Sequence, residues 1–363
     1  SLYATTAWEM TRSGDLIRTT FDGVLDYYNS KPPLNVWLIA ASYKLFDVGL
    51  VSLRIPSACA ALLTVVVFLW WSGRSFGTSV SLVATVVLAT SFGFLHIHAA
   101  RSGNPDALLT LAILLVVVLL AESSKAPWRR VWLGPLLGLV FLLKGMAVLQ
   151  PLLLIVLFES VVAQSLKTRL PPLAIGAFTS VAIAGGWARL RWQVDGWEFL
   201  HRIVGNDFLA LSLTPLEGHN TGPLFYFGVL HRYQYEWLFV GALAIAMTYR
   251  SLGGRLTRLM NQLCERKPLA IVLVAWGVVT LGVPSAMQTR LAWYLNPFYP
   301  LFALLVGLAI VQGWSELRGA RRARMTLIGF AVVALIIAES KSLWRLYHVT
   351  NLDTSVQGLL IRH

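Results

Sequence analysis

The sequence predicts an all-α polytopic membrane protein. Of its 363 residues, 56% are hydrophobic and 13% are charged, against roughly 45–50% and about 25% in soluble globular proteins. The mean hydropathy is +0.66. Long apolar blocks recur along the chain, and none alternates with the period of two that a membrane β-barrel requires. These observations exclude an ordinary soluble enzyme, a disordered chain and a fibrous repeat.

Apolar blocks of nearly the length of a membrane span, about 20 residues, indicate about ten transmembrane helices. They are expected at about 53–71, 78–98, 106–121, 131–145, 150–163, 171–188, 235–249, 268–286, 296–313 and 325–339. Residues 33–47 are apolar but too short to span, so we expect an interfacial or re-entrant helix there.

The net charge of +13 would suggest nucleic acid on a soluble chain. Here the basic residues are scattered among apolar blocks, so no nucleic-acid partner is expected. Half of the 30 lysines and arginines lie in the alternate linkers 72–77, 122–130, 164–170, 250–267 and 314–324. The positive-inside rule makes these linkers cytoplasmic.

The remaining segments then face outward. Residues 1–52 form a first outer loop with interfacial helices, 53–340 form the multi-span domain with its outer loop 189–234, and 341–363 form a short outer tail. The turns near 99–106 and 288–295 also face outward. A first loop on this side needs a span to carry it across, so we expect a first helix upstream of Ser1.

Asp106 is expected at the outer mouth of a span, directly after the turn-forming pair Asn104-Pro105. One interpretation is a carboxylate that caps the helix and interacts with its dipole. The other is a general base or metal ligand, because an ionisable residue at this depth is a functional candidate. Arg101 could pair with Asp106 or bind an anion.

Two lysines lie near the same face. Lys31 precedes two prolines that rigidify the chain, and Lys144 ends an apolar block before Gly145. A lysine at headgroup level is a suitable point charge for a phosphate, although either residue could simply extend its ammonium to the interface. Lys144 could also line a cavity.

The outer segments are rich in aromatic and basic residues. His219 lies in the long outer loop, and Arg290, Trp293 and Tyr294 lie at a later outer mouth. Such residues are typical of an aromatic belt, and they also suit sugar stacking and phosphate contact. We find no P-loop, dinucleotide fingerprint, HExxH or CxxC motif. His96 and His98 are two residues apart, so on a helix they would not face the same way to bind one metal ion.

Several motifs resemble polyprenyl-phosphate-dependent glycosyltransferases of superfamily C (GT-C). The similarity is to the protein O-mannosyltransferase and lipid A aminoarabinose transferase group, the PMT/ArnT-like group. It rests on the motifs Tyr3-Ala4, Glu9-Met10, Ser13-Gly14-Asp15, Lys31-Pro32-Pro33 with Trp37, RSGNPDALLTL, FLLKG, GHNTGPLFYF and RLAWYLNPFYP. These motifs follow in the family's order over most of the chain.

The resemblance implies an inverting transfer of a sugar from a polyprenyl-phosphate donor to a protein, lipid or glycan acceptor at the outer face. Asp106 would be catalytic or hold a divalent metal. The donor lipid phosphate would contact Lys31, with Arg101, Arg290 and Tyr294 nearby. Candidate cavity or acceptor contacts are Tyr27, Tyr28, Lys144 and His219. The family's acidic residue before the Tyr-Ala motif would lie upstream of Ser1.

The resemblance also implies a bacterial inner membrane enzyme of the cell envelope. The alternative function is a transporter or flippase of a lipid-linked or anionic substrate, which requires charged residues inside the spans and repeat symmetry. A non-catalytic scaffold is a third option. The enzyme hypothesis predicts that Asp106, Lys31 and Arg290 surround one outer cavity.

Overall fold

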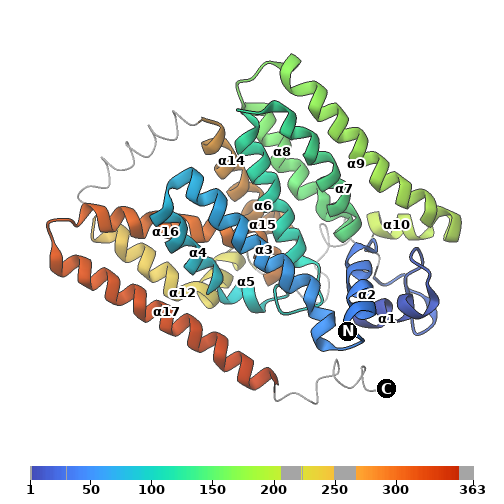
Figure 1. The fold of residues 1–363 in the computed structure, drawn as a ribbon, viewed down its shortest axis with the longest axis horizontal. Helices are drawn as coiled ribbons and strands as arrows, with labels where there is room; N and C mark the ends of the chain where they lie inside the picture. The colour runs from blue at the N-terminus through green and yellow to red at the C-terminus, as the bar shows by residue number, and fades with distance from the viewer. Residues whose placement is uncertain (1, 30, 206–221, 223, 249–266, 351–363) are drawn as a thin grey trace.

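The computed structural model describes residues 2–29, 31–205, 222, 224–248 and 267–350. In this part of the chain nearly all regular structure is helical (Figure 1). The helices are α1 (Leu2–Ser13), α2 (Leu34–Phe46), α3 (Leu50–Phe76), α4 (Thr78–Ala89), α5 (Phe92–His96), α6 (Asp106–Ser123), η1 (Pro127–Trp132), α7 (Leu133–Lys144), η2 (Gly145–Val148), α8 (Leu149–Val161), α9 (Leu166–Asp195), α10 (Glu198–Val204), α12 (Phe225–Ala246), α14 (Lys267–Gly277), η6 (Val278–Gly282), α15 (Val283–Ala286), η7 (Ala292–Phe298), α16 (Tyr299–Glu316) and α17 (Arg321–Thr350). A short hairpin of two antiparallel strands, β1 (Thr20–Phe21) and β2 (Val24–Leu25), lies between α1 and α2.

Each of the ten apolar blocks overlaps a helix, but the count of ten spans is not confirmed. Seven helical stretches within the described residues are long and apolar enough to cross a membrane. Helix α4 is shorter than expected, because the helix is interrupted at Thr90 and Ser91 before α5 begins. Helix α17 continues to Thr350, well beyond the expected end at residue 339.

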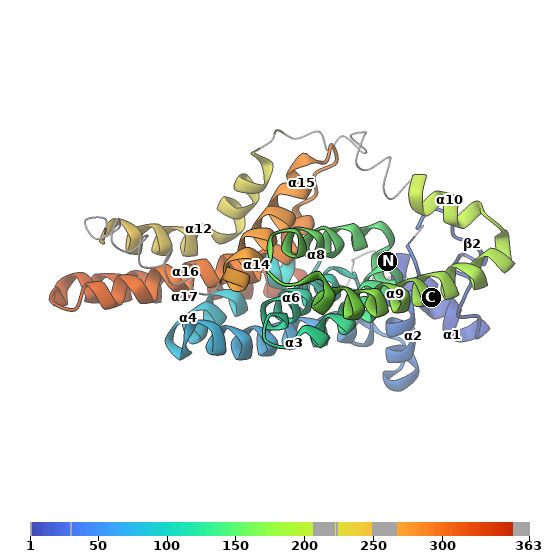
Figure 2. The ribbon, with the colours of Figure 1, turned by 90° about the horizontal axis from the view of Figure 1, so that it is seen from above.

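Helix α12 is not one of the seven stretches, because its first half carries polar residues. It bends at Gln234, whose backbone is not helical (φ −135°, ψ 18°), and Figure 2 shows its two parts at an angle. The buried side chains of Ser91 and Thr90 contact Gln234 and Trp237 across this bend.

The apolar stretch 127–161 is a hairpin rather than one long span. Gly145 ends α7 with a positive φ of 53°. Beyond Gly145, α8 runs antiparallel to α7. The reversal brings Glu159, near the end of α8, back to η1, where its carboxylate lies 2.7 Å from the guanidinium of Arg130. The fully buried Arg130 also donates to Ser123 O and to the Gln164 side chain. This cluster joins two linkers that the sequence assigns to one membrane side.

Residues 33–47 form the expected short helix as α2, of 13 residues. Helices α1 and α2 and the start of α3 share a small core of their own, while the larger core lies among α3, α4, α6, α8, α12, α14 and α16. Trp187 and Phe199 link the two parts by packing α9 and α10 against the N-terminal segment. The interfacial position of α2 stays a prediction.

Candidate functional site

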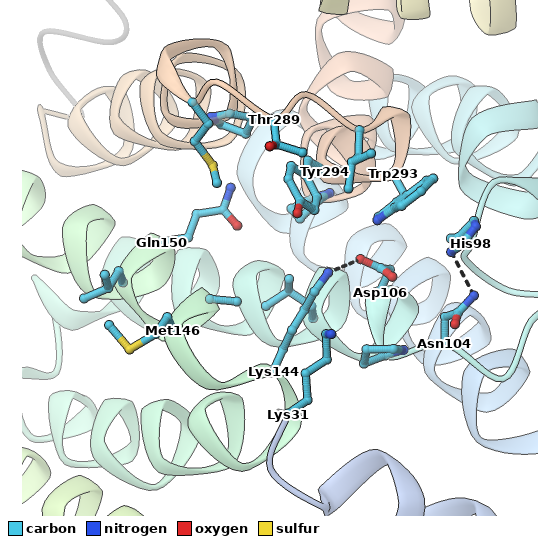
Figure 3. Close-up of a pocket in the computed structure, with 18 of the residues that line it drawn as sticks. Lys31, His98, Asn104, Asp106, Lys144, Met146, Gln150, Thr289, Trp293 and Tyr294 are labelled. Carbon is cyan, nitrogen blue, oxygen red and sulfur yellow. Dashed lines mark hydrogen bonds and ion pairs between the residues drawn. The ribbon is translucent and has the colours of Figure 1, made fainter. Parts of the chain in front are cut away.

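A pocket of about 490 Å³ lies where four segments far apart in the sequence meet (Figure 3). These segments are the N-terminal region through residue 31, the turn 98–105 with the start of α6, the junction of α7 with α8, and residues 283–297. All four were expected at or near the outer face from the distribution of basic residues. The pocket and the Arg130 cluster lie at opposite ends of α6, about 25 Å apart at 1.5 Å per residue.

An ion pair between two helix ends forms the centre of the pocket. Asp106 is the first residue of α6 and is 4% exposed, and Lys144 is the last residue of α7. Lys144 Nζ lies 2.6 Å from Asp106 Oδ1. Each charge also lies at the helix end whose dipole favours it, the carboxylate at an N-terminus and the ammonium at a C-terminus. Asp106 therefore pairs with Lys144 and not with Arg101.

A second ammonium enters the pocket from the N-terminal region. Lys31 precedes Pro32-Pro33 and α2, and its Nζ lies 3.5 Å from Asn29 Oδ1. The carboxylate of Asp26 in turn accepts hydrogen bonds from the backbone N–H groups of Tyr28 and Asn29. Figure 3 shows the Lys31 ammonium on the same side of the pocket as that of Lys144. The lining thus carries two ammonium groups against one carboxylate, which favours an anionic ligand.

Aromatic rings form the opposite wall. The Tyr294 ring centroid lies 5.4 Å from Lys144 Nζ, close enough for a cation–π interaction. The Trp293 ring stacks on His98 with centroids 3.9 Å apart. His98 has a positive φ of 52°, and its Nδ1 lies 2.9 Å from Asn104 Nδ2. A flat aromatic face beside cations suits a sugar next to a phosphate.

The pKa of His98 lies below its usual range. Burial lowers it first, the nearby Asp106 carboxylate raises it and the Lys144 ammonium lowers it again. His98 is therefore neutral at pH 7 and offers one hydrogen-bond donor and one acceptor. The sequence presents His98 only as a possible metal ligand and does not predict its position in this pocket. The one available indication was that His98 precedes Asp106 by eight residues, in the same turn.

The other sequence-predicted residues are divided between the pocket and its surroundings. Tyr28 lines the pocket. Arg290 does not, although its neighbours Thr289 and Leu291 do, and its Nε donates to Ser285 O. Tyr27 lies outside, with the Arg202 guanidinium 4.9 Å from its ring; burial and the Asp195 carboxylate raise its pKa. His219 lies outside the described residues.

Arg101 also lies outside the pocket lining. Burial lowers its pKa, and so do the guanidinium groups of Arg54 on α3 and Arg345 on α17. These three arginines come from segments that the sequence analysis treated separately. Of the three residues expected around one cavity, Asp106 and Lys31 line the pocket and Arg290 does not. Lys144 and Tyr294 line it as well.

The pocket residues that the structure describes do not fit a divalent metal ion. Asp106 contributes its single carboxylate, and Oδ1 of that carboxylate already binds an ammonium. Within the described residues there is no group of three or more His, Cys, Asp or Glu side chains that could hold a metal. Two lysines beside the carboxylate oppose a bound cation by charge repulsion.

Comparison with known proteins identifies similar sequences. Residues 30–187 match the model of the dolichyl-phosphate-mannose-protein mannosyltransferase family. The chain is 27% identical over 360 residues to the undecaprenyl phosphate-alpha-4-amino-4-deoxy-L-arabinose arabinosyl transferase of Pseudomonas savastanoi pv. phaseolicola, covering 93% of this chain and 62% of the relative. It is also 27% identical over 329 residues to the transferase of the same name from Pseudomonas aeruginosa, covering 85% of this chain and 54% of that relative. The chain thus spans between 54% and 62% of these two relatives.

Solved structures share the fold. ArnT from Cupriavidus metallidurans bound to undecaprenyl phosphate superposes with a TM-score of 0.71 at 19% identity, over 91% of this chain and 58% of that one. The Archaeoglobus fulgidus oligosaccharyltransferase AglB, in complex with an inhibitory peptide and a dolichol-phosphate, gives 0.58 at 14% identity, over 94% and 51%.

Proposed function

Because this chain is a PMT/ArnT-like protein of the GT-C superfamily, we propose that it transfers a sugar from a polyprenyl-phosphate donor. Its relatives in Pseudomonas are named for an undecaprenyl phosphate-linked sugar. The observation that carries the proposal is the pocket in which Lys31 and Lys144 flank the buried Asp106 beside an aromatic wall. Cations, a carboxylate and ring faces are the groups that this reaction needs.

The proposed reaction is one displacement with inversion at the anomeric carbon. An acceptor oxygen attacks this carbon, the bond from carbon to the phosphate oxygen breaks, and its electron pair stays on the polyprenyl phosphate. The acceptor proton passes to Oδ2 of Asp106, because Oδ1 already accepts a hydrogen bond from Lys144 Nζ. A positioned base of this kind accelerates a reaction about 100- to 10,000-fold.

In this proposal the two lysines bind and stabilise the leaving phosphate. Negative charge grows on the phosphate as the bond breaks, so fixed ammonium groups lower the barrier. Lys144 has two functions, since it also orients the Asp106 carboxylate. Trp293 and Tyr294 supply ring faces for the sugar. Arg290, next to Thr289 at the pocket edge, and Arg101 stay as proposed secondary phosphate contacts.

We further place the reaction at the outer face of a bacterial inner membrane. The basic linkers support this orientation through the positive-inside rule, because the pocket lies at the opposite helix ends. This placement at a membrane surface favours chemistry over transport through the midplane. Leu2 and Tyr3 from the N-terminal region also line the pocket. The proposed acceptor is a protein, a lipid or a glycan.

The test is turnover of a radiolabelled polyprenyl-phosphate sugar by the purified protein in nanodiscs. We expect Asp106→Asn to lower the rate of sugar release or transfer at least about 100-fold, and Lys31→Ala to lower it by about 100-fold or more. Matched controls are Asp47→Asn and Lys44→Ala, because both residues are exposed and outside the pocket lining.

Controls that retain activity while both pocket variants lose it would support the proposal. Full turnover in Asp106→Asn and Lys31→Ala would contradict it. Transbilayer movement of the donor without sugar release, measured after the protein is reconstituted into sealed vesicles, would point to the flippase instead.

A further inference from the structure

A second cavity, remote from the proposed reaction, lies between α4, α12, α16 and α17. Its volume is about 730 Å³, within the range of ligand pockets in proteins. Its sides are apolar and include Val83, Ile310 and Leu335. Leu82 and Val86 on α4 and Ile328 and Val332 on α17 also line it and remain 39–54% exposed. The cavity therefore opens sideways, toward the surface that lipid would contact.

Polar groups gather at one end of this groove. Ser79 lies in the first turn of α4, Ser315 lies in the last turn of α16, and Arg318 and Arg324 lie on either side of the start of α17. The same linker also carries Arg321, Arg322 and Glu316, so this end has an excess of positive charge. Apart from Trp237, whose indole N–H donates to Thr90, and Trp314, the remaining lining is aliphatic.

The Arg324 guanidinium is held in position by an aromatic ring and, within the described part of the chain, has an unsatisfied hydrogen-bond donor. Its guanidinium carbon lies 3.7 Å from the centre of the Trp314 ring, so one of its faces is covered. Its Nε is buried and has no hydrogen-bond partner among the described residues. A buried donor without a partner costs about 1–3 kcal/mol, and an anionic oxygen at this point would satisfy it.

The dimensions match one membrane leaflet. From Arg324 to Leu335 the groove follows α17 for about 16 Å at 1.5 Å per residue, and half of a typical hydrocarbon core is about 15 Å. Helix α16 runs from the proposed reaction pocket to this basic end over 18 residues. The groove thus belongs to the leaflet opposite that pocket.

We propose that this groove binds an anionic phospholipid, with one acyl chain along α4 and α17 and the phosphate between Arg318 and Arg324. Charge complementarity favours a lipid over a second protein helix, because the cations lie only where the groove reaches headgroup level. Basic pockets between transmembrane helices are known to bind anionic headgroups.

The test counts bound lipids by native mass spectrometry of the delipidated protein, titrated with phosphatidylglycerol or phosphatidylethanolamine of identical acyl chains. We expect the wild type to bind phosphatidylglycerol at least tenfold more tightly. Arg318→Ala with Arg324→Ala should abolish this preference. The matched control, Arg321→Ala with Arg322→Ala, removes the same charge from the same linker outside the groove and should keep it.

A groove-filling variant provides an independent test with both arginines intact. Val332→Trp should reduce lipid binding at least tenfold while the thermal melting temperature without lipid stays within a few degrees of wild type. Equal losses in the two arginine pairs would overturn the site in favour of diffuse surface charge. Equal affinity for the two lipids, or a dimer that Val332→Trp disrupts without change in lipid binding, would also overturn it.

Discussion

At the scale of single residues, the pocket is organised by a salt bridge between Asp106 and Lys144 that is mostly withdrawn from water. Their side chains are 5% and 13% exposed. Removing one partner of such a pair costs more than removing both, because the remaining charge stays buried without compensation. The pair therefore has a structural role that can be separated from its proposed chemistry.

We predict that Lys144→Met lowers the free energy of unfolding by about 3 kcal/mol. The double variant Asp106→Asn with Lys144→Met should recover most of this loss, since no unpaired carboxylate remains. Equilibrium unfolding in mild detergent measures both variants and the Asp106→Asn single variant, which completes the double-mutant cycle. Strictly additive effects of the two changes would show that the pair is not coupled.

The lowered pKa of His98 predicts a pH dependence of stability. Because the folded state binds a proton less readily than the unfolded state, the contribution of His98 is complete above about pH 6.5. It is lost as the pH falls from there toward the folded-state pKa. His98→Gln should therefore lose less thermal stability than the wild type between pH 7.5 and pH 5.5. An identical loss in both proteins would contradict the lowered pKa.

At the scale of elements, the site depends on close packing of α7 against α9. A Cβ atom at Gly134 would overlap the carbonyl oxygen of Gly176, and one at Gly138 would press on Ile183. The two glycines are four residues apart, the spacing that lets membrane helices approach closely. This contact fixes α7, and with it the position of Lys144.

Gly134→Ala is accordingly expected to destabilise the protein by about 1–3 kcal/mol through overpacking. Gly186→Ala in α9 is the matched control, because a Cβ there meets no atom within 4 Å. Thermal unfolding in detergent should show a drop of several degrees for Gly134→Ala and no drop for Gly186→Ala. Equal melting temperatures would indicate that α7 and α9 can separate without cost.

At the scale of the whole molecule, the proposed function requires the pocket and the Arg130 cluster to lie on opposite sides of a membrane. Tyr28 lines the pocket and is 81% exposed, while Trp128 beside the Arg130 cluster is 63% exposed. Both positions are therefore accessible to a thiol reagent if a cysteine is placed there.

In a background of Cys59→Ser and Cys264→Ser, an impermeant maleimide added to intact spheroplasts should label Tyr28→Cys. It should label Trp128→Cys only after the membrane is permeabilised. The reverse labelling pattern would place the pocket on the cytoplasmic side of the membrane and would contradict the proposed orientation.

The sequence was informative about elements and about charge, and less so about contacts. The apolar blocks located the helices, and the basic linkers grouped the segments that supply Lys31, Asp106 and Tyr294 to one pocket. Asp106 and Lys144 are 38 residues apart in the sequence, and their pairing depends on the turn at Gly145. The pattern of hydropathy along the chain does not predict such a pairing. Arg54 on α3 and Arg345 on α17 lie close enough to Arg101 to lower its pKa, and hydrophobic periodicity cannot predict this approach of three segments.

The most direct test of the central claim is an experimental structure of the protein with undecaprenyl phosphate bound. We expect the phosphate between the ammonium groups of Lys31 and Lys144, with the Asp106 carboxylate facing the open side of the pocket. A phosphate bound instead by Arg54, Arg101 and Arg345, with the pocket empty, would contradict the donor site and the chemistry derived from it.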